Sequence, residues 1–425
     1  MGASATTTTQ LPLLKRLWGN NVAEPLYKRS KFFAMAKKDT NFGGEGRYVV
    51  VTIAPTSGGS ANFGDALNNQ GATQEKRFFV QHRKEYQVFS IQGDLIARSR
   101  GDKNAVLNAL EQQADKARYA FGRSMAQRAW GNGGGSLGRL DSTTTLTGTT
   151  LRLRTRSDFA RVEPGMYLTF ASDDGSSSTP AGTRDSSKQL QILSVARKAA
   201  SGYAELTMSA NLNTVASITT NDYFHRGGDY ALAMTGLPGW GPIAAPTGGE
   251  SFMGLDRTVG DVERLSGTRV TGGGKPKEET IIDAAAEGHL VGIDGELVLW
   301  THPLDFRDVV KEMGSKRFID VKTDMASIGF RALEADGATG PIKIISEPDC
   351  PQGYFWLEDM AQIYFRSAGE CPMLLNEDGA GKLLRASNDD AYQGRLGCYG
   401  NWFHENPGGQ VIVSTAYESS GDVVM

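Results

Sequence analysis

The chain has 425 residues, enough for two or three domains with well-buried cores. Its 45 lysines and arginines against 48 aspartates and glutamates give a net charge of −3, so the overall charge does not indicate a nucleic-acid-binding protein. No stretch is long and apolar enough to predict a membrane span, and the first residues lack the pattern of a signal peptide. Three widely spaced cysteines predict no disulfide framework, which fits a reducing cytosol: Cys350, Cys371 and Cys398.

Residues 1–41 predict an extended N-terminal arm. Seven basic residues oppose only Glu24 and Asp39 in this segment, which gives it a net charge of +5. Such a run is usually a solvated tail, and the alternative is an arm that lies over a neighbour or faces a polyanion. The short apolar pair Phe32-Phe33 favours a docked arm.

Residues 42–91 predict a long β-hairpin. Arg47 to Ile53 and Arg77 to Ile91 are rich in β-branched and aromatic residues, and the segment between them is rich in Gly, Ser, Asn and Gln. Its tip, Ala54 to Glu75, contains only two large apolar side chains, Phe63 and Leu67. Because a two-stranded ribbon is marginally stable in water, the hairpin is expected to need another surface to lie on.

Residues 92–136 predict one long helix, Lys103 to Trp130, about 40 Å in length. Asp102 can cap its start, Gly131 can provide a left-handed stop, and Arg118 can pair with Asp115. Apolar residues recur along it in steps of three and four: Val106, Leu110, Ala114, Ala117, Phe121 and Met125.

Residues 137–228 change in character after a glycine-rich linker. Leu151 to Arg156 alternates with period two, and several other short strands are separated by Gly, Ser and Asp. This pattern predicts a small β-barrel or β-sandwich inserted into the main chain.

Residues 229–360 predict a mixed α/β domain, and strands from about 361 to 425 are expected to complete the domain of the long helix. The predicted helices are Lys277 to Glu287 and Asp305 to Met313. The predicted strands are Leu297 to Trp300, Ile342 to Ile345 and Gln410 to Val413.

The motifs that could carry catalysis stand in the wrong context. Gly133 to Gly138 matches a dinucleotide fingerprint and places Ser136 in a nucleophile-elbow pattern, but it follows a helix and precedes β sequence. The five histidines share no metal-like spacing, and Asp173-Asp174-Gly175 reads as a turn. We therefore expect no enzyme activity, no cofactor and no metal site. The alternative is a cytosolic hydrolase built on the α/β body, with Ser136 or an unrecognised site.

The order of arm, hairpin, long helix, β insertion, α/β body and β-rich tail resembles the major capsid proteins of tailed phages. These share the Hong Kong 97-type fold with herpesvirus shells, and the resemblance, strongest to a subfamily with a β insertion, covers nearly the whole chain. Its specificity comes from the order of local motifs: Phe252 to Arg257, Arg264 to Gly267, His302 to Leu304, Gly314 to Lys316, Gly340 to Ile345 and Asp349 to Pro351. The sequence predicts no long N-terminal helical scaffolding segment of the kind that some relatives have, which implies a separate scaffolding protein or none.

The resemblance implies an α+β fold with an extended N-arm, an E-loop hairpin, a spine helix in a peripheral domain, an axial domain and an inserted β domain. It implies self-assembly into pentamers and hexamers that form an icosahedral head around double-stranded DNA, assembled in the host cytoplasm, without a membrane. Scaffolding, portal and decoration proteins are further partners of such shells, and an encapsulin-like compartment is the alternative within the fold. The residues expected at inter-subunit contacts are Phe63, Leu67, Arg118, Arg123 and Arg128. The residues expected to face DNA or scaffold are Lys15, Arg16, Lys28, Arg29 and Lys31.

Overall fold

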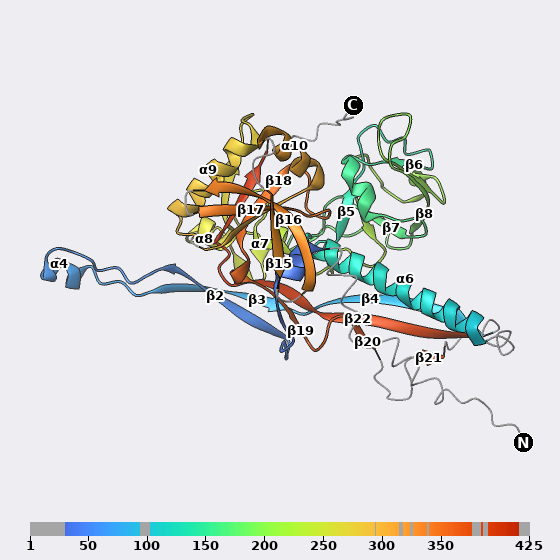
Figure 1. Ribbon diagram of the computed structural model, residues 1–425, viewed down its shortest axis with the longest axis horizontal. Helices are drawn as coiled ribbons and strands as arrows, with labels where there is room; N and C mark the ends of the chain where they lie inside the picture. The colour runs from blue at the N-terminus through green and yellow to red at the C-terminus, as the bar shows by residue number, and fades with distance from the viewer. Residues whose placement is uncertain are drawn as a thin grey trace, which may run out of the picture.

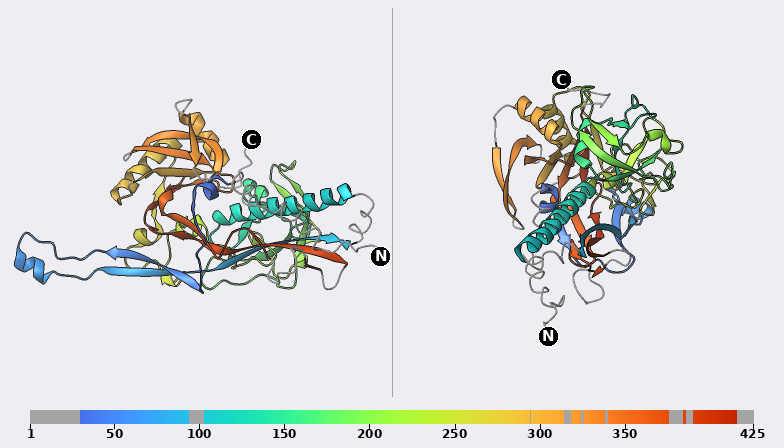
Figure 2. Two further views of the ribbon diagram at one scale, coloured as in Figure 1. Left: turned by 60° about the horizontal axis from the view of Figure 1, so that its bottom comes forward. Right: turned by 90° about the vertical axis from the view of Figure 1, so that its right-hand side faces the viewer.

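The computed structural model describes residues 30–93, 103–293, 295–313, 318–323, 326–337, 340–375, 384–385 and 390–415. Helices and separate sheets alternate along the chain, which confirms the expected α+β class. The molecule is elongated (Figures 1 and 2): a hairpin projects from one end, and a long helix lies along a β-ribbon at the other. An α/β body and a smaller β lobe rise above this base.

The long helix predicted from periodicity is α6, Lys103–Ala129. It lies on a ribbon in which β4, Arg83–Gln92, pairs antiparallel with β22, Ala391–His404. Its expected stripe is buried at Ala114, Ala117, Phe121 and Met125, whereas Asp102 and the side chains of Val106 and Leu110 lie outside the described residues.

The expected left-handed stop at Gly131 is wrong. The N–H groups of Trp130 and Gly131 donate to the carbonyls of Gln127 and Arg128, respectively. The helix therefore ends in a 3-10 turn, in which each hydrogen bond joins residues three positions apart. Positive φ angles occur later, 93° at Gly133 and 84° at Gly135, where the chain turns into the β lobe.

The N-terminal segment docks on the chain's own core. Residues 31–35 form a short helix, α3, Lys31–Met35, so the predicted arm is not extended in this part. The ring of Phe32 lies 5.1 to 5.3 Å from those of Trp130, Trp300 and Trp402. Next, β1, Lys37–Asp39, pairs parallel with β19, Ile363–Ser367. The six-stranded sheet also contains β22, β4, β20 (Met373–Leu374) and β21 (Leu384–Arg385).

The hairpin is shorter than the predicted range of 42–91. It consists of β2, Gly46–Ala54, and β3, Gln74–Gln81, whereas β4 pairs with β22 instead. Its inner face packs on the body through a cluster that includes Val51, Phe78 and Trp240. A short helix at the tip, α4, Phe63–Asn68, was not expected; the Asn62 side chain caps it by accepting the Gly64 N–H.

The β lobe is one six-stranded sheet in the order β5-β10-β7-β8-β9-β6. Its buried residues, among them Leu151, Phe170 and Phe224, form a hydrophobic cluster separate from the other cores. Its strands are β5 (Ser136–Arg139), β6 (Thr150–Arg152), β7 (Tyr167–Ala171), β8 (Leu190–Ala196), β9 (Glu205–Met208) and β10 (Tyr223–Arg226). Two 3-10 turns, Arg156–Arg161 and Leu212–Thr214, connect them.

The α/β body is built on a seven-stranded sheet in the order β13-β23-β18-β14-β17-β16-β15. One face carries Leu299, Phe355 and Val411 in a cluster with α9, and the other face carries Trp300 and Trp356 toward the end of α6. The strands are β13 (Thr268–Thr271), β14 (Leu297–Thr301), β15 (Phe318–Thr323), β16 (Ala326–Gly337), β17 (Gly340–Ser346), β18 (Tyr354–Asp359) and β23 (Gln410–Ser414). The helices are α8 (Val262–Ser266), α9 (Lys277–Leu290) and α10 (Pro303–Met313). In the sequence, the segment between the lobe and the body contains α7 (Leu237–Trp240), β11 (Ser251–Phe252) and β12 (Leu255–Asp256). A 3-10 turn, Met360–Gln362, precedes β19.

The position of β23 corrects the expectation that all strands after about 361 complete the domain of the long helix. β23 lies between β13 and β18 inside the body sheet. Its run Val411, Ile412 and Val413 is fully buried, because adjacent side chains point to opposite faces and both faces are covered.

Candidate functional site

The tip of the hairpin presents apolar side chains to solvent. Phe63 is 81% exposed and Leu67 is 60% exposed, and α4 buries none of its residues. Asp65 lies between them and is also exposed. Figure 2 shows the tip far from the rest of the molecule. Because none of the described residues covers it, this surface is available for contact with another molecule.

A groove of about 580 Å³ lies between β4 and the segment that leaves the β lobe. Its apolar residues include Tyr86, Val88 and Leu232, which are 46%, 50% and 59% exposed. Lys84 is exposed beside them, and Arg83 donates to the Ala231 carbonyl at 3.3 Å. The groove therefore combines apolar side chains with positive charge.

Four charged residues from β4, α6 and the end of the β lobe form an ionic cluster. Three of them, Glu85, Arg226 and Asp229, also line the groove. Glu85 is 3% exposed, and one of its oxygens accepts Arg128 Nε at 3.0 Å. Its other oxygen accepts from Arg226 and from the Ser124 hydroxyl. Asp229 completes the cluster by accepting from both arginines, with Arg226 Nε at 2.8 Å. The cluster thus joins the ribbon, the long helix and the lobe.

The charges of the cluster are mutually supporting. Burial would raise the pKa of Glu85, but the positive charges of Arg128 and Arg226 outweigh it and lower that pKa to about 2. Burial would likewise lower the pKa of Arg226, but Glu85 and Asp229 raise it. Glu85 and Arg226 are therefore both charged at neutral pH, and removing either one leaves the other without a partner in a buried site.

The three arginines expected at inter-subunit contacts take part in packing within the chain. Arg118 is 9% exposed and pairs with Asp115 at 3.1 Å, which confirms the expected ion pair. Arg123 donates to backbone carbonyls of the β lobe and pairs with Glu163. Arg128 belongs to the ionic cluster. Their expected contact with a neighbour stays a prediction.

Of the residues expected to face DNA or scaffold, only Lys31 is described; Lys15, Arg16, Lys28 and Arg29 lie outside the described residues. Lys31 is the first residue of α3 and is half-buried, and burial lowers its pKa. Its position is set by the docked helix rather than by a free tail.

A buried carboxyl holds α3 in place. Glu347 follows β17 and accepts the backbone N–H groups of Lys31 at 2.9 Å and Phe32 at 3.3 Å. Its complete burial, and secondarily the charge of Asp349, raise the pKa of Glu347 to about 8. The docked arm therefore depends on a carboxyl that titrates near neutral pH.

We expect the stability of the chain to fall as the pH rises. The pKa of Glu347 is higher in the folded chain, about 8, than its ordinary value of 4.5, so its contribution is complete below 4.5 and is lost as the pH passes 8. Replacing it in E347Q should remove this part of the pH dependence, on the order of a few kcal/mol, while an amide oxygen still accepts from α3. Urea unfolding of both proteins between pH 5 and pH 9 measures the difference. Parallel pH profiles would contradict the role of Glu347.

The motifs considered for catalysis do not assemble into a site. Ser136 begins strand β5 and its hydroxyl donates to the Gly138 carbonyl, so it does not occupy the strand-to-helix turn of a nucleophile elbow. Asp173 accepts the Gly175 N–H at 3.2 Å, as expected for a turn. Within the described ranges, no three His, Cys, Asp or Glu residues are grouped as metal ligands. No described helix has the length and apolar character needed to cross a membrane.

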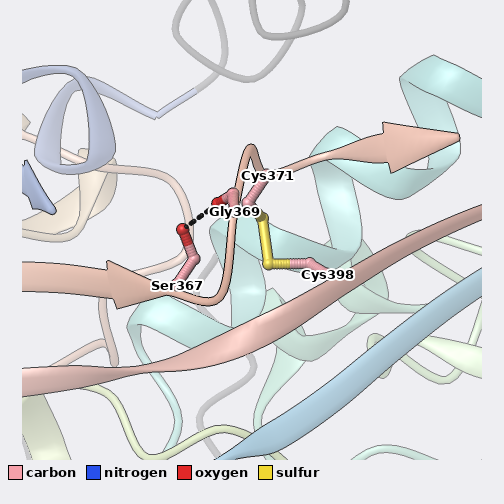
Figure 3. The surroundings of a disulfide bond; sticks show 4 residues. All are labelled: Ser367, Gly369, Cys371 and Cys398. Atoms are coloured by element: carbon pink, nitrogen blue, oxygen red, sulfur yellow. Dashed lines mark hydrogen bonds between the residues drawn. A yellow bond between two sulfur atoms is a disulfide. The ribbon is translucent and has the colours of Figure 1, made fainter. Parts of the chain in front are cut away.

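The expectation of no disulfide is wrong. Cys371 and Cys398 are bonded, with Cα atoms 5.1 Å apart, whereas Cys350 is a buried free thiol. Figure 3 shows the bond joining the loop after β19 to the middle of β22. A spacing of 27 residues does not reveal the pair, because strand pairing brings the two cysteines together.

The fold is shared with a phage capsid chain. The capsid asymmetric unit of cyanophage A-1(L) matches with a TM-score of 0.50 and 11% identity, over 90% of this chain and 92% of that chain. The capsid of a native GTA particle matches with a TM-score of 0.42 and 10% identity, over 98% and 92% of the two chains. A virus-like particle from Pyrococcus furiosus matches with a TM-score of 0.40 and 8% identity, over 94% and 98%. No protein-family model matches the sequence, and no curated protein matches it.

Proposed function

We propose that this chain is the major capsid protein of a tailed phage and that it assembles into pentamers and hexamers of an icosahedral head around double-stranded DNA. The observation that carries the proposal is the fold, shared with the cyanophage A-1(L) capsid over nine-tenths of both chains. The exposed tip supports it independently, since Phe63 and Leu67 are not covered by the part of the chain that the structure describes.

The parts of the chain take corresponding roles in this proposal. The hairpin β2–β3 is the E-loop, α6 is the spine helix of a peripheral domain, and the seven-stranded sheet is the core of an axial domain of the Hong Kong 97 type. The six-stranded lobe is an inserted domain, supported by its separate hydrophobic cluster. Head-to-tail contacts between such subunits close into rings when the rotation between them permits.

The hairpin tip is proposed to dock on an adjacent subunit, beside the C-terminal half of its α6. The groove supplies apolar cover for Phe63 and Leu67 through Tyr86, Val88 and Leu232. The positive charge of Lys84 in this groove complements Asp65, the acidic residue of α4. Each contact can be weak, because many act together in a closed shell.

The enclosed DNA and a separate scaffolding protein are proposed to face the basic N-terminal arm. Its lysines and arginines would contact phosphate without sequence specificity, and such contacts weaken with salt. Portal and decoration proteins remain further candidate partners. Assembly is proposed to occur in the host cytoplasm, with the mature protein in the virion.

The experiment that tests the function is size-exclusion chromatography of the purified full chain, followed by electron microscopy. Closed shells, or rings of five and six subunits, are the expected result. A compact monomer at every concentration tested would overturn the proposal. Nuclease-protected DNA in particles from infected cells is expected for a phage head, and shells that contain protein cargo without DNA would instead indicate a compartment.

The inserted lobe should be removable. Gly135 and Asp229 lie so close that a Cβ on Gly135 would meet the Asp229 carbonyl oxygen at 2.4 Å, so a short linker can replace residues 137–228. We expect the remainder to unfold cooperatively and to be less stable by about 1.5–3 kcal/mol, because Glu85 loses its bond to Arg226. Calorimetry of the deletion variant beside the full chain measures this. Loss of the cooperative transition would contradict a separable lobe.

A further inference from the structure

The disulfide lies where strand β22 changes partners. Residues Gly400 to His404 of β22 pair with β19, which belongs to the body end of the sheet. Leu396 and Gly397 instead pair with β20, beyond the loop that contains Cys371. Cys398 stands between these two stretches, and its bond to Cys371 closes that loop onto the ribbon (Figure 3).

Glycines on both sides of Cys398 make this part of the ribbon weak. Gly397 and Gly400 flank it, and a glycine inside a strand loses backbone entropy without adding packing. Gly400 is also required by space, since a Cβ there would lie 2.6 Å from the Arg366 carbonyl oxygen. A covalent bond at this point therefore adds a link where the glycines contribute no side-chain packing of their own.

The two cysteines differ in access. Cys398 is fully buried in the core that contains Phe121 and Trp402, whereas Cys371 is only partly buried at its edge. An oxidant in solution can thus reach Cys371 first. Cys398 lies opposite Glu85 in the β4–β22 ladder, so the bond forms one strand away from the ionic cluster that joins ribbon, helix and lobe.

We propose that Cys371 and Cys398 form a redox-controlled clamp on the ribbon. The pair is open as two thiols while the chain assembles in a reducing cytoplasm, and it closes by oxidation once the particle is outside. This timing rests on the proposed function, because a particle that leaves the cell passes from reducing to oxidising surroundings. The clamp itself is a bond that forms and opens at the junction of β19, β20 and β22, and it does not depend on the proposed function.

The chemistry balances with a small-molecule disulfide such as oxidised glutathione. The Cys371 thiolate attacks one glutathione sulfur, forms a mixed disulfide and releases one glutathione thiolate. The Cys398 thiolate then attacks the Cys371 sulfur, which forms the protein disulfide and releases the second glutathione. The protein loses two electrons and two protons, and one oxidised glutathione becomes two reduced molecules.

The test uses the full-length chain, reduced and then treated with oxidised glutathione, followed by intact-mass measurement. The wild type should lose the mass of two hydrogens. C398S should retain one glutathione on Cys371, and C371S should carry none, because Cys398 is buried. C350S is the matched control and should oxidise as the wild type does. A wild type that stays reduced, or a glutathione found on Cys398 in C371S, would overturn the proposal.

Hydrogen exchange supplies a readout that needs no variant. The amides of Met373 to Leu375 and Arg395 to Gly400 should exchange roughly tenfold more slowly, or more, in the oxidised wild type than in the reduced one. Amides of β7 in the lobe should not change. Equal exchange in both redox states would show that the bond clamps nothing. Both measurements work on unassembled chain, so they can fail or succeed independently of shell formation.

Discussion

Trimming the hairpin tip should abolish or distort assembly and leave the subunit as stable as before. The variant replaces Ser57 to Gly71 by a two-residue turn. The two ends already lie side by side, since the Gly71 N–H donates to the Ser57 carbonyl at 2.9 Å. The helix of the tip, α4, has no buried residue. Loss of the tip should therefore change the free energy of unfolding by no more than about 0.5 kcal/mol. Thermal melting and particle counts in electron micrographs, made on the same protein, measure the two effects.

A matched variant separates the chemistry of the tip from its length. F63S combined with L67S keeps the loop and α4 but removes the apolar side chains, and it should impair assembly as trimming does. Normal particles from either variant would show that the tip is not an inter-subunit contact. A large fall in melting temperature would show instead that the tip belongs to the subunit's own fold.

Charge exchange tests the groove as the surface that receives the tip. D65K should weaken assembly, because it brings a second positive charge toward Lys84, and K84D should weaken it by placing two acids together. The double variant should recover particles at the salt concentration at which each single variant fails. Failure to recover would place the tip on another surface of the neighbour and would leave the trimming result unaffected.

The elements that follow from local pattern were predictable from the sequence. The steps of three and four along α6 predicted both its existence and its buried face at Ala114, Ala117 and Phe121. The alternating strands of the lobe and the apolar run of β23 were equally visible. The strands that pair with β23 could not be predicted. A continuous apolar run such as Val411 to Val413 predicts a strand covered on both faces, but it does not indicate the sheet to which the strand belongs.

The candidate site depended on contacts between distant segments, which one sequence does not reveal. Arg128 was expected to face a neighbour because it is charged and near a helix end. Its position, seven residues after Phe121 and three after Met125, places it on the buried stripe, and this spacing was the available signal. Glu85 gave a matching signal, since it shares a strand face with the buried Phe89. Two opposite charges at buried positions indicate a buried pair.

Removing the Glu85 carboxylate should therefore produce the largest loss of stability among single substitutions in this region. E85A leaves Arg128 and Arg226 with only Asp229 to balance them in a buried site, and we expect a loss of about 3–5 kcal/mol. E75A, at an exposed position of the hairpin, is the matched control and should change stability by no more than about 0.5 kcal/mol. Denaturant unfolding of the three proteins at neutral pH measures these differences.

The pH dependence of the same proteins identifies the cause of that loss. The pKa of Glu85 is lowered from its ordinary value of 4.5 to about 2 in the folded chain, so its stabilisation is complete above 4.5 and disappears as the pH falls toward 2. E85Q keeps the size and the hydrogen-bonding oxygen of the side chain but has no charge to lose. The difference in unfolding free energy between wild type and E85Q should therefore shrink between pH 5 and pH 2. A difference that stays constant would mean that Glu85 stabilises the junction through packing, and that the charges of Arg128 and Arg226 are balanced elsewhere.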